Sequence, residues 1–365
     1  MKNKQTILNI KQYVGEIDIL KYLVPQPEIT LLVAPTGAGK TTALMKLAEQ
    51  NDFNLAFVSP FTSINEQVQQ SFPQFKIETG MKTQEYVSFG KHTITTFHSI
   101  PRLLELDNID VLVVDEAHQL VNYSTYASGI LNPFWDTLKA LRVKHPTMKI
   151  IFATGTPQFV RLYPEFNFNE IIVKPEVMLG DKIETISVSG SQKNEYSKGS
   201  YICLYGSRKQ GAQQALKYSG DFVESNNKEF NKAYQSIITE GRLLKPRLFT
   251  STLLATGVSI LDEVDKAIVA WSDIVDCVQF ISRLRNGCPR VCITSGTFWH
   301  EKNGVPFKPL KWTGDFCKDM KQLAQFQQWF SYTVRTHPED IVYENILRLM
   351  LTSPEADIIE ELAKY

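Results

Sequence analysis

The stretch VAPTGAGKTT, residues 33–42, has residue types and a spacing that suit the binding of phosphate groups. Glycines in such a loop let backbone N–H groups approach an anion closely. We expect Lys40 to reach the β- and γ-phosphates of a nucleotide and Thr41 to place its hydroxyl on Mg²⁺. The alternative is a glycine turn without a ligand. The residues expected around the nucleotide are Pro35, Thr36, Gly37, Ala38, Gly39, Lys40, Thr41 and Thr42.

A pair of acids follows the apolar run VLVV in the stretch VLVVDEAH, residues 111–118. Asp115 at the end of a strand could hold the magnesium shell, and Glu116 could orient and deprotonate an attacking water. The two acids could instead cap a helix. Together with the phosphate loop upstream, they indicate hydrolysis of a nucleoside triphosphate.

Apolar runs rich in Val, Ile and Leu alternate with amphipathic stretches from Glu28 onward. This pattern is typical of parallel strands that are buried on both faces and joined by crossover helices. The phosphate loop directly follows the first such run and opens the amphipathic stretch TTALMKLAEQ, which is the context that a phosphate site needs. The runs are EITLLVAP, NLAFVSP, HTITTF, DVLVVDE and KIIFATGTP.

The stretch IVKPEVMLGDK, residues 172–182, contains Pro175 and Gly180 and has no clear period, which predicts a linker. A second alternation of strands and helices follows, including a predicted helix over DIVDCVQFISRLRN. After Lys311, apolar residues recur at spacings of three, four and seven, which is typical of helices. We therefore expect an α/β fold with domains over residues 1–175 and 183–298 and a helical extension over 305–365. The extension either packs on the second domain or offers a docking surface for a partner protein.

The composition is that of a soluble globular protein, with 43% apolar and 21% charged residues among 365. A net charge of +0 means that nucleic-acid binding would depend on a localised groove. Five cysteines without a C-x-x-C pair, and no apolar leader, predict reduced thiols in the cytoplasm. We expect no membrane partner, because no apolar run is long enough to span a bilayer.

In their order, these motifs resemble those of the superfamily 2 helicases and translocases, whose DEAH box stands letter for letter at residues 115–118. The resemblance runs from about Leu31 to Asn286, and the arginine spacing near its end is similar to that of viral and phage replication helicases such as the herpesvirus origin-binding protein. The other stretches that carry the resemblance are FVSPFTSINEQ, TITTFHS, FATGTP, CLYGSRK, FTSTLLATGVSI and QFISRLRN.

The resemblance implies two RecA-like parallel-sheet domains in tandem, with ATP and Mg²⁺ bound between them. It implies that Arg283 or Arg285 stabilises the transferring phosphoryl group, and it leaves open which of the two does so. Gly257 is expected at the nucleotide. It belongs to FTSTLLATGVSI, which resembles motif V of the family, and in that motif Ser259 stands where aspartate is common. Gln5 and Gln12 are candidates for reading adenine. The residues expected to couple hydrolysis to domain motion are His118, Thr154, Thr156 and Gln279.

The same resemblance implies a nucleic-acid groove built from small hydroxyls that bind phosphates without reading bases. Each of these residues taken singly could instead be a turn or cap residue. They are Ser59, Thr62, Thr95, Thr96, Ser207, Thr250 and Ser251.

We therefore expect a monomeric ATP-dependent helicase or translocase on single-stranded or partly duplex nucleic acid. DNA is favoured over RNA by the likeness to viral and phage enzymes. The alternative is a partner-activated switch or loader that closes on nucleic acid without processive unwinding.

Overall fold

The computed structural model describes residues 4–74, 76–78, 92–189, 196, 198–224, 230–251, 254, 258–270, 273–294 and 304–365. Gly257, predicted at the nucleotide, lies outside these residues. The chain divides into two compact units. Unit 1 comprises Met1–Glu176 and Lys308–Phe326, and unit 2 comprises Val177–Phe307 and Gln327–Tyr365. None of the described helices is both long and apolar enough to cross a membrane.

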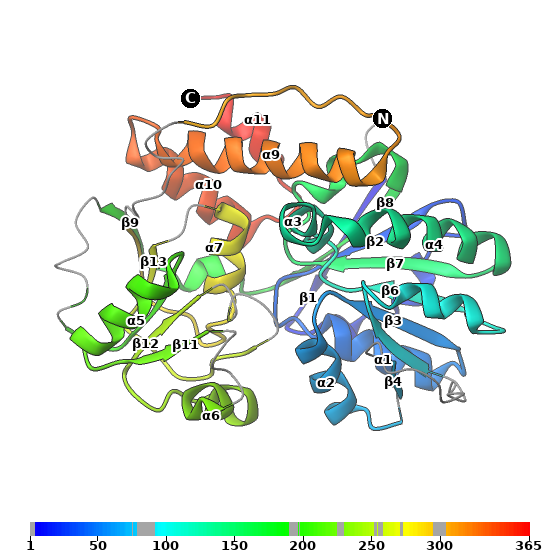
Figure 1. Cartoon of the computed structure of the whole chain (residues 1–365), viewed down its shortest axis with the longest axis horizontal. Helices are drawn as coiled ribbons and strands as arrows, with labels where there is room; N and C mark the ends of the chain where they lie inside the picture. Colours follow the sequence, from blue (N-terminus) through cyan, green and yellow to red (C-terminus); the bar gives the residue numbers. More distant parts are fainter. Residues whose placement is uncertain are drawn as a thin grey trace. The chain divides into compact units, whose positions relative to one another are not determined.

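Unit 1 contains, within the described residues, an 8-stranded sheet in the order β1-β8-β2-β7-β6-β3-β5-β4 (Figure 1). Every neighbouring pair is parallel, as the apolar runs predicted. The strands are β1 (Lys4–Ile10), β2 (Ile29–Val33), β3 (Leu55–Ser59), β4 (Lys76–Glu78), β5 (His92–Thr96), β6 (Val111–Val114), β7 (Lys149–Thr154) and β8 (Phe168–Pro175).

Both faces of this sheet are covered, which explains why its central strands lack polar alternation. Leu31 and Val33 of β2 belong to one core cluster, while Leu32 between them belongs to another. The first cluster includes residues of α3 (Gln119–Tyr126), α4 (Leu131–Lys144) and the start of α9 (Phe316–Arg335). The second includes residues of α1 (Lys40–Gln50) and α2 (Thr62–Ser71).

Strands β1, β4 and β8 were not expected, and the predicted linker was wrong at its start, because residues 172–175 are the end of β8. β1 is an edge strand with a largely exposed, alternating pattern, so it lacks the apolar run that marks the other strands. Gln5 on β1 donates to Glu170 Oε2 at 3.1 Å, and Arg161 pairs with the same oxygen at 3.2 Å. The Gln5 amide therefore holds two strands together in this structure.

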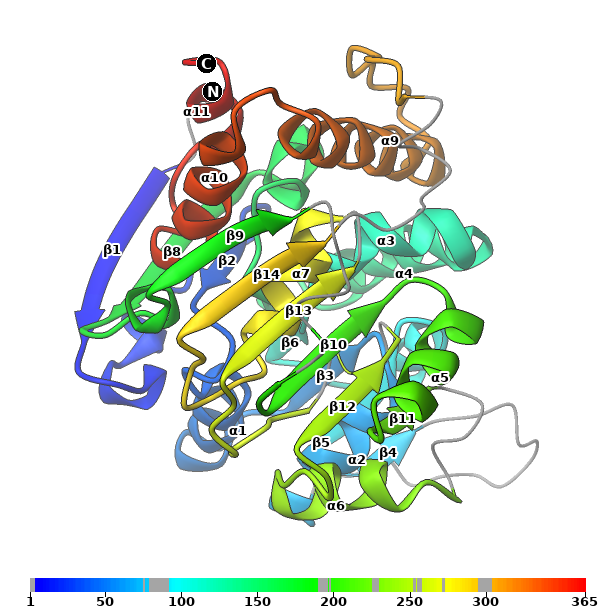
Figure 2. The same cartoon turned by 90° about the vertical axis from the view of Figure 1, so that its left-hand side faces the viewer.

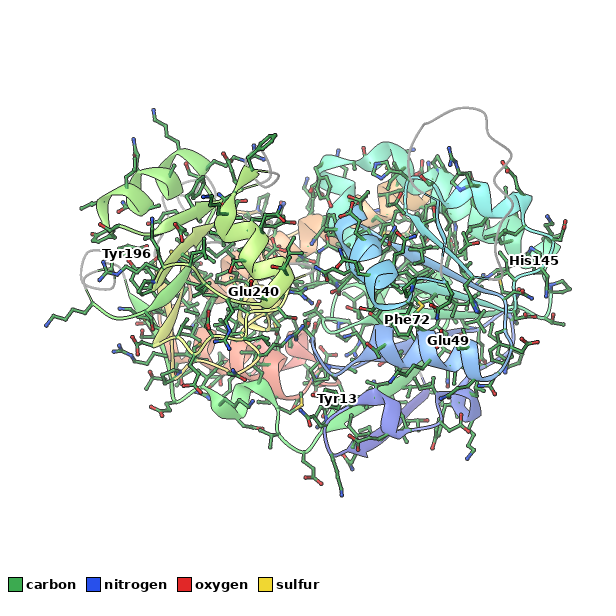
Figure 3. All side chains as sticks on the ribbon, turned by 90° about the horizontal axis from the view of Figure 1, so that it is seen from below. Tyr13, Glu49, Phe72, His145, Tyr196 and Glu240 are labelled. Atoms are coloured by element: carbon green, nitrogen blue, oxygen red, sulfur yellow. The ribbon has the colours of Figure 1, made fainter. Side chains whose placement is uncertain are left out.

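Unit 2 contains a second sheet, 6-stranded within the described residues, in the order β11-β12-β10-β13-β14-β9 (Figure 2). All its neighbouring pairs are again parallel. Tyr196, labelled in Figure 3, is buried against Tyr201, Tyr205 and Phe249 of this unit. The described strands are β9 (Thr185–Ser189), β10 (Tyr201–Tyr205), β11 (Asp221–Val223), β12 (Arg247–Thr250), β13 (Lys266–Ala270) and β14 (Arg290–Thr294). Among the described residues of this unit up to residue 294, the α-helices are α5 (Arg208–Lys217), α6 (Lys232–Glu240) and α7 (Ile274–Ile281).

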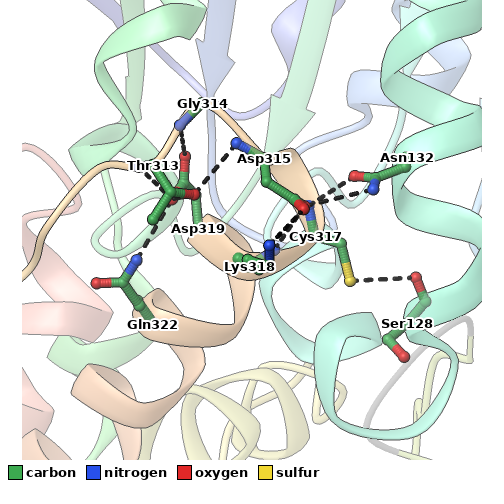
Figure 4. Close-up of polar contacts among 9 residues, drawn as sticks. All are labelled: Ser128, Asn132, Thr313, Gly314, Asp315, Cys317, Lys318, Asp319 and Gln322. Carbon is green, nitrogen blue, oxygen red and sulfur yellow. Dashed lines mark hydrogen bonds and ion pairs between the residues drawn. The ribbon is translucent and has the colours of Figure 1, made fainter.

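The C-terminal segment is helical, as expected, with α9, α10 (Asp340–Thr352) and α11 (Ile358–Leu362). It does not fall within one unit, since residues 308–326 belong to unit 1 and residues 327–365 to unit 2. A turn before α9 is fixed by the buried carboxylate of Asp319 (Figure 4). Asp319 accepts hydrogen bonds from the Thr313 amide and hydroxyl at 2.8 Å each and from the Gly314 amide at 3.2 Å. Asn132 of α4 accepts from the Cys317 amide at 2.8 Å, which ties the start of α9 to unit 1.

Phe316, the first residue of α9, is buried and stacks on Trp135, with ring centroids 5.1 Å apart. We expect Phe316→Ala to lower the free energy of unfolding by about 3–5 kcal/mol, because it leaves an aromatic-sized cavity. Urea denaturation measures this change. Phe230→Ala is the matched control, because that ring is 92% exposed, and its effect should be small. An equal effect of the two variants would contradict this packing.

Candidate nucleotide-binding site

The phosphate loop connects β2 to α1 and needs glycine at two positions. Gly37 and Gly39 have φ of 89° and 78°, which side chains other than glycine rarely adopt. The loop packs on the end of β7, where the Ala34 amide donates to Thr154 O at 3.2 Å. A Cβ atom on Gly155 would lie 3.1 Å from Thr36 Oγ1. The loop geometry is therefore maintained by its own backbone and by close contact with β7.

The predicted phosphate and metal ligands lie together at this edge of the sheet. Lys40 is buried, and its ammonium donates to Ala34 O at 2.8 Å and Pro35 O at 3.2 Å, which keeps the cation at the loop. The Thr41 hydroxyl donates to Asp115 Oδ2 at 3.3 Å. A hydroxyl beside a carboxylate is an oxygen donor set that suits Mg²⁺. These residues therefore fit the metal and the phosphates that the sequence implies.

Burial raises the pKa of Asp115 to about 6, and the charge of neighbouring Glu116 adds to the shift, while Lys40 opposes it. The folded protein thus binds this proton more tightly than the unfolded chain, whose reference pKa is 3.8. The free energy of unfolding should therefore fall as pH rises from about 4 to about 6. Above that range, the full loss of stability from the ionised Asp115 is present. A bound divalent cation would offset this cost.

Asp115→Asn should accordingly raise the free energy of unfolding at neutral pH by something on the order of 1–3 kcal/mol in the absence of nucleotide. Urea denaturation across this pH range tests it, because the gain should vanish below about pH 4. Asp265→Asn is the control of opposite sign, since hydrogen bonds from Ser200 lower the pKa of Asp265. A gain that is independent of pH would contradict the titration of Asp115.

Glu116 is buried and has φ of 48°, an unusual value for a residue with a side chain. Its Oε2 lies 3.5 Å from His118 Nδ1, and that nitrogen lies 3.0 Å from Thr154 Oγ1. The Thr156 amide donates to the same hydroxyl at 3.0 Å. The structure thus brings together Glu116, His118, Thr154 and Thr156, three of which were predicted as coupling residues.

Two neighbours of the site were missed by the sequence reasoning. Gln119 is buried, and its Nε2 lies 3.0 Å from His118 Nε2, so it orients the imidazole from the side opposite Thr154. Tyr13, labelled in Figure 3, is 50% exposed, and its Cδ1 would lie 3.6 Å from a Cβ on Gly39. The side-chain amide of Gln12 donates through Nε2 to the Tyr13 hydroxyl at 2.8 Å.

A short helix, η1 (Val14–Glu16), holds Tyr13 beside the loop, since the Val14 amide donates to Ala38 O at 2.8 Å. The Glu16 carboxylate accepts hydrogen bonds from the amides of residues 11–13, which lower its pKa. No capping-box signal was available in the sequence here, because that motif has Ser or Thr at the position of Tyr13.

The hydroxyls predicted to bind nucleic acid have mixed environments in unit 1. Ser59 and Thr95 are fully buried, and the Ser59 hydroxyl donates to Asn65 Oδ1 at 2.6 Å. Thr96 is buried and donates to Ser99 Oγ at 3.4 Å. Thr62, at the start of α2, is exposed. Only Thr62 among these four presents its side chain to solvent in this structure.

In unit 2, Ser207 caps α5 by accepting from the Gln210 amide at 3.3 Å, and Ser251 is half-buried. Thr250 is fully buried, and its hydroxyl donates to Val223 O at 3.0 Å. The contact of Ser207 fits a cap role, which was the alternative for each residue taken singly.

The arginines predicted to act on the phosphoryl group lie beyond α7, which ends at Ile281 rather than continuing to residue 286 as expected. Arg283 is buried and donates to Gln279 Oε1 at 3.2 Å. Arg285 is half-buried, and its Nε and Nη2 donate to Ser259 Oγ at 2.9 and 2.8 Å. Ser259, the departure from motif V, thus contacts Arg285 of QFISRLRN, the stretch that resembles motif VI of the family.

Comparisons with known proteins agree with this architecture. Residues 3–159 match the family model described as "Type III restriction enzyme, res subunit". A structure of S. cerevisiae Dbp5 bound to RNA and ADP BeF3 is similar with a TM-score of 0.56 and 14% identity, over 93% of this chain and 94% of that chain. The chain has the fold of tandem RecA-like helicase domains.

A second similar structure is that of the Mycobacterium smegmatis helicase Lhr bound to ssDNA and AMP-PNP. Its TM-score is 0.54 and its identity 13%, over 89% of this chain. This chain spans 54% of the Lhr chain, so about half of that protein has no counterpart here. None of the curated proteins compared with the chain matches it.

Proposed function

We propose that this protein is an ATP-dependent nucleic-acid helicase or translocase of the DEAH type. The observation that carries the proposal is the grouping of Lys40, Thr41, Asp115 and Glu116 at one sheet edge of unit 1. The family model and the helicase fold support it, since the two similar structures contain ADP BeF3 with RNA and AMP-PNP with ssDNA.

In the proposed reaction, Lys40 binds the β- and γ-phosphates, while Thr41 and Asp115 would hold Mg²⁺, which would neutralise charge on the phosphates when bound. Glu116 orients the attacking water and accepts its proton. His118 connects Glu116 to Thr154. A shift of β7 and the loop after it therefore changes the position of the Glu116 carboxylate. Arg283 or Arg285 stabilises the charge of the transferring phosphoryl group.

The base of the nucleotide is proposed to pack on the ring of Tyr13, with the Gln12 amide beside it. The support is the position of Tyr13 against the phosphate loop and its half-exposed ring. An adenine would stack on such a ring and could receive a hydrogen bond from Gln12.

We propose DNA as the preferred polymer on the likeness of the motifs to viral and phage replication helicases. A partner-activated switch or loader is the second candidate, and the net charge of +0 favours it, because such a chain attracts nucleic acid weakly at long range.

The test is steady-state ATP hydrolysis by the purified chain with no polymer, single-stranded DNA, duplex DNA or single-stranded RNA, with Glu116→Gln as the blank. Strong stimulation by one polymer is the expected result and identifies the substrate. Hydrolysis that no polymer changes would contradict the motor and favour the partner-activated switch.

A further inference from the structure

The strands β3 and β5 end in buried hydroxyl residues, and a ring follows each strand end. β3 and β5 are parallel neighbours with Ser59 paired to Thr96, so the segments that follow them emerge at the same edge. Phe61 follows β3 and is half-buried, and His98 follows β5 and is exposed. The Phe97 amide donates to Ser59 O at 3.0 Å, which ties the second segment to the first.

Helix α3 adds two rings to this edge. Tyr123 and Tyr126 are three residues apart, so they lie on the same side of the helix, and their ring centroids are 4.9 Å apart. The ring of Tyr123 also lies 5.8 Å from His98 and 6.3 Å from Phe61. Three segments that are distant in the sequence therefore contribute to one aromatic cluster, which consists of Phe61, His98, Tyr123 and Tyr126.

The cluster has a rigid base and an exposed top. Tyr123 is 2% exposed and its hydroxyl donates to Pro60 O, so this ring is fixed by the core. Burial also raises the pKa of Tyr123 to about 12, so the hydroxyl keeps its proton at neutral pH. Tyr126 is 60% exposed, an unusual position for a large ring that only covers its own core.

We propose that this aromatic cluster is a stacking site for an unpaired base of single-stranded nucleic acid, with Tyr126 and His98 as the rings that contact the base. This inference rests on the proposed function and specifies how the polymer is bound. Aromatic faces accept any base that is free of its own stack, which a duplex does not offer.

The charge of the chain limits the ways in which this occupant can be held. With 39 basic and 39 acidic residues, the whole molecule supplies little attraction for phosphates. Ring stacking does not require net charge, and it is a sequence-tolerant source of affinity. The exposed Thr62 begins α2 directly after Phe61. A hydroxyl that can donate to a phosphate of the nucleic acid therefore directly follows a residue of the cluster.

The cluster also adjoins the ATP site through α3. This helix begins at Gln119, which contacts His118, and ends at Tyr126. A base bound at the cluster can therefore change the position of His118, which links Glu116 to Thr154.

The experiment measures fluorescence anisotropy of a labelled oligothymidylate and of the same strand made abasic throughout. Tyr126→Ala should weaken binding of the oligothymidylate by about fivefold to a hundredfold, while Tyr126→Phe should bind nearly as the unchanged protein does. The abasic strand should bind the unchanged protein and Tyr126→Ala equally. His98→Ala is the second variant, and Tyr365→Ala, whose ring is 48% exposed, is the control.

The salt dependence separates stacking from phosphate contacts, because loss of a ring releases no counterion and should leave the slope of affinity against salt unchanged. If the unchanged protein binds the oligothymidylate and both Tyr126→Ala and His98→Ala bind it equally well, the stacking site is wrong and the proposed function stands. Equal weakening of the abasic strand by Tyr126→Ala would also overturn it. If the unchanged protein binds neither the oligothymidylate nor the abasic oligonucleotide, the proposed function itself is wrong.

Discussion

Glu116→Gln is expected to bind ATP and to hydrolyse it at least about a hundredfold more slowly than the unchanged protein, which is the typical contribution of a general base. The carboxamide keeps the size of the side chain but cannot accept the proton of the attacking water. Lys40, Thr41 and Asp115 remain in place to bind the phosphates and Mg²⁺. Removal of the Glu116 charge also removes one cause of the raised pKa of Asp115, so metal binding should not weaken.

Steady-state hydrolysis and the affinity for a fluorescent ATP analogue are the two measurements. Glu49→Gln is the matched control, because Glu49 is exposed on α1 (Figure 3). Near-normal turnover of Glu116→Gln would exclude Glu116 as the base. Loss of nucleotide affinity together with turnover would instead indicate a role in binding.

The sheets and the phosphate loop could be predicted because their signals are continuous in the sequence. Buried parallel strands have uninterrupted apolar runs, and the loop and the acid pair directly follow two of these strands, β2 and β6. β1 was missed because an edge strand needs only one apolar face, and the helix over residues 282–286 was wrong because Leu284 forms a bridge with Ile260 in place of a further turn.

The details of the site depend on tertiary contacts that residue types do not reveal. Serine and threonine at strand ends suggested phosphate contacts, but the direction of a side chain follows from the pairing of its strand, and Ser59 and Thr250 face inward. Tyr13 reaches the phosphate loop, and Gln119 reaches His118, only in the folded chain.

Arg285→Ala is expected to lower the rate of ATP hydrolysis by about 10³-fold or more while nucleotide affinity is retained, since an arginine that meets the transferring phosphoryl group contributes 10³–10⁵ in rate. We choose Arg285 over Arg283 for this prediction. The Arg283 guanidinium is buried and donates to Gln279, whereas Arg285 is half-buried. The backbone at Arg285 is fixed, because its amide donates to Ile260 O at 3.0 Å.

Ser259 should act on the rate through Arg285, because its hydroxyl accepts two hydrogen bonds from that guanidinium. Ser259→Ala should therefore lower turnover less than Arg285→Ala does, by about tenfold or more, because alanine removes both hydrogen bonds to the charged group. The double variant should be no slower than Arg285→Ala alone, because the serine has no further effect once the arginine is gone. Arg242→Ala is the control, since that arginine is 63% exposed in a surface ion pair with Asp262. If Arg283→Ala alone loses hydrolysis, the catalytic arginine is Arg283, and the contact between Ser259 and Arg285 only stabilises unit 2.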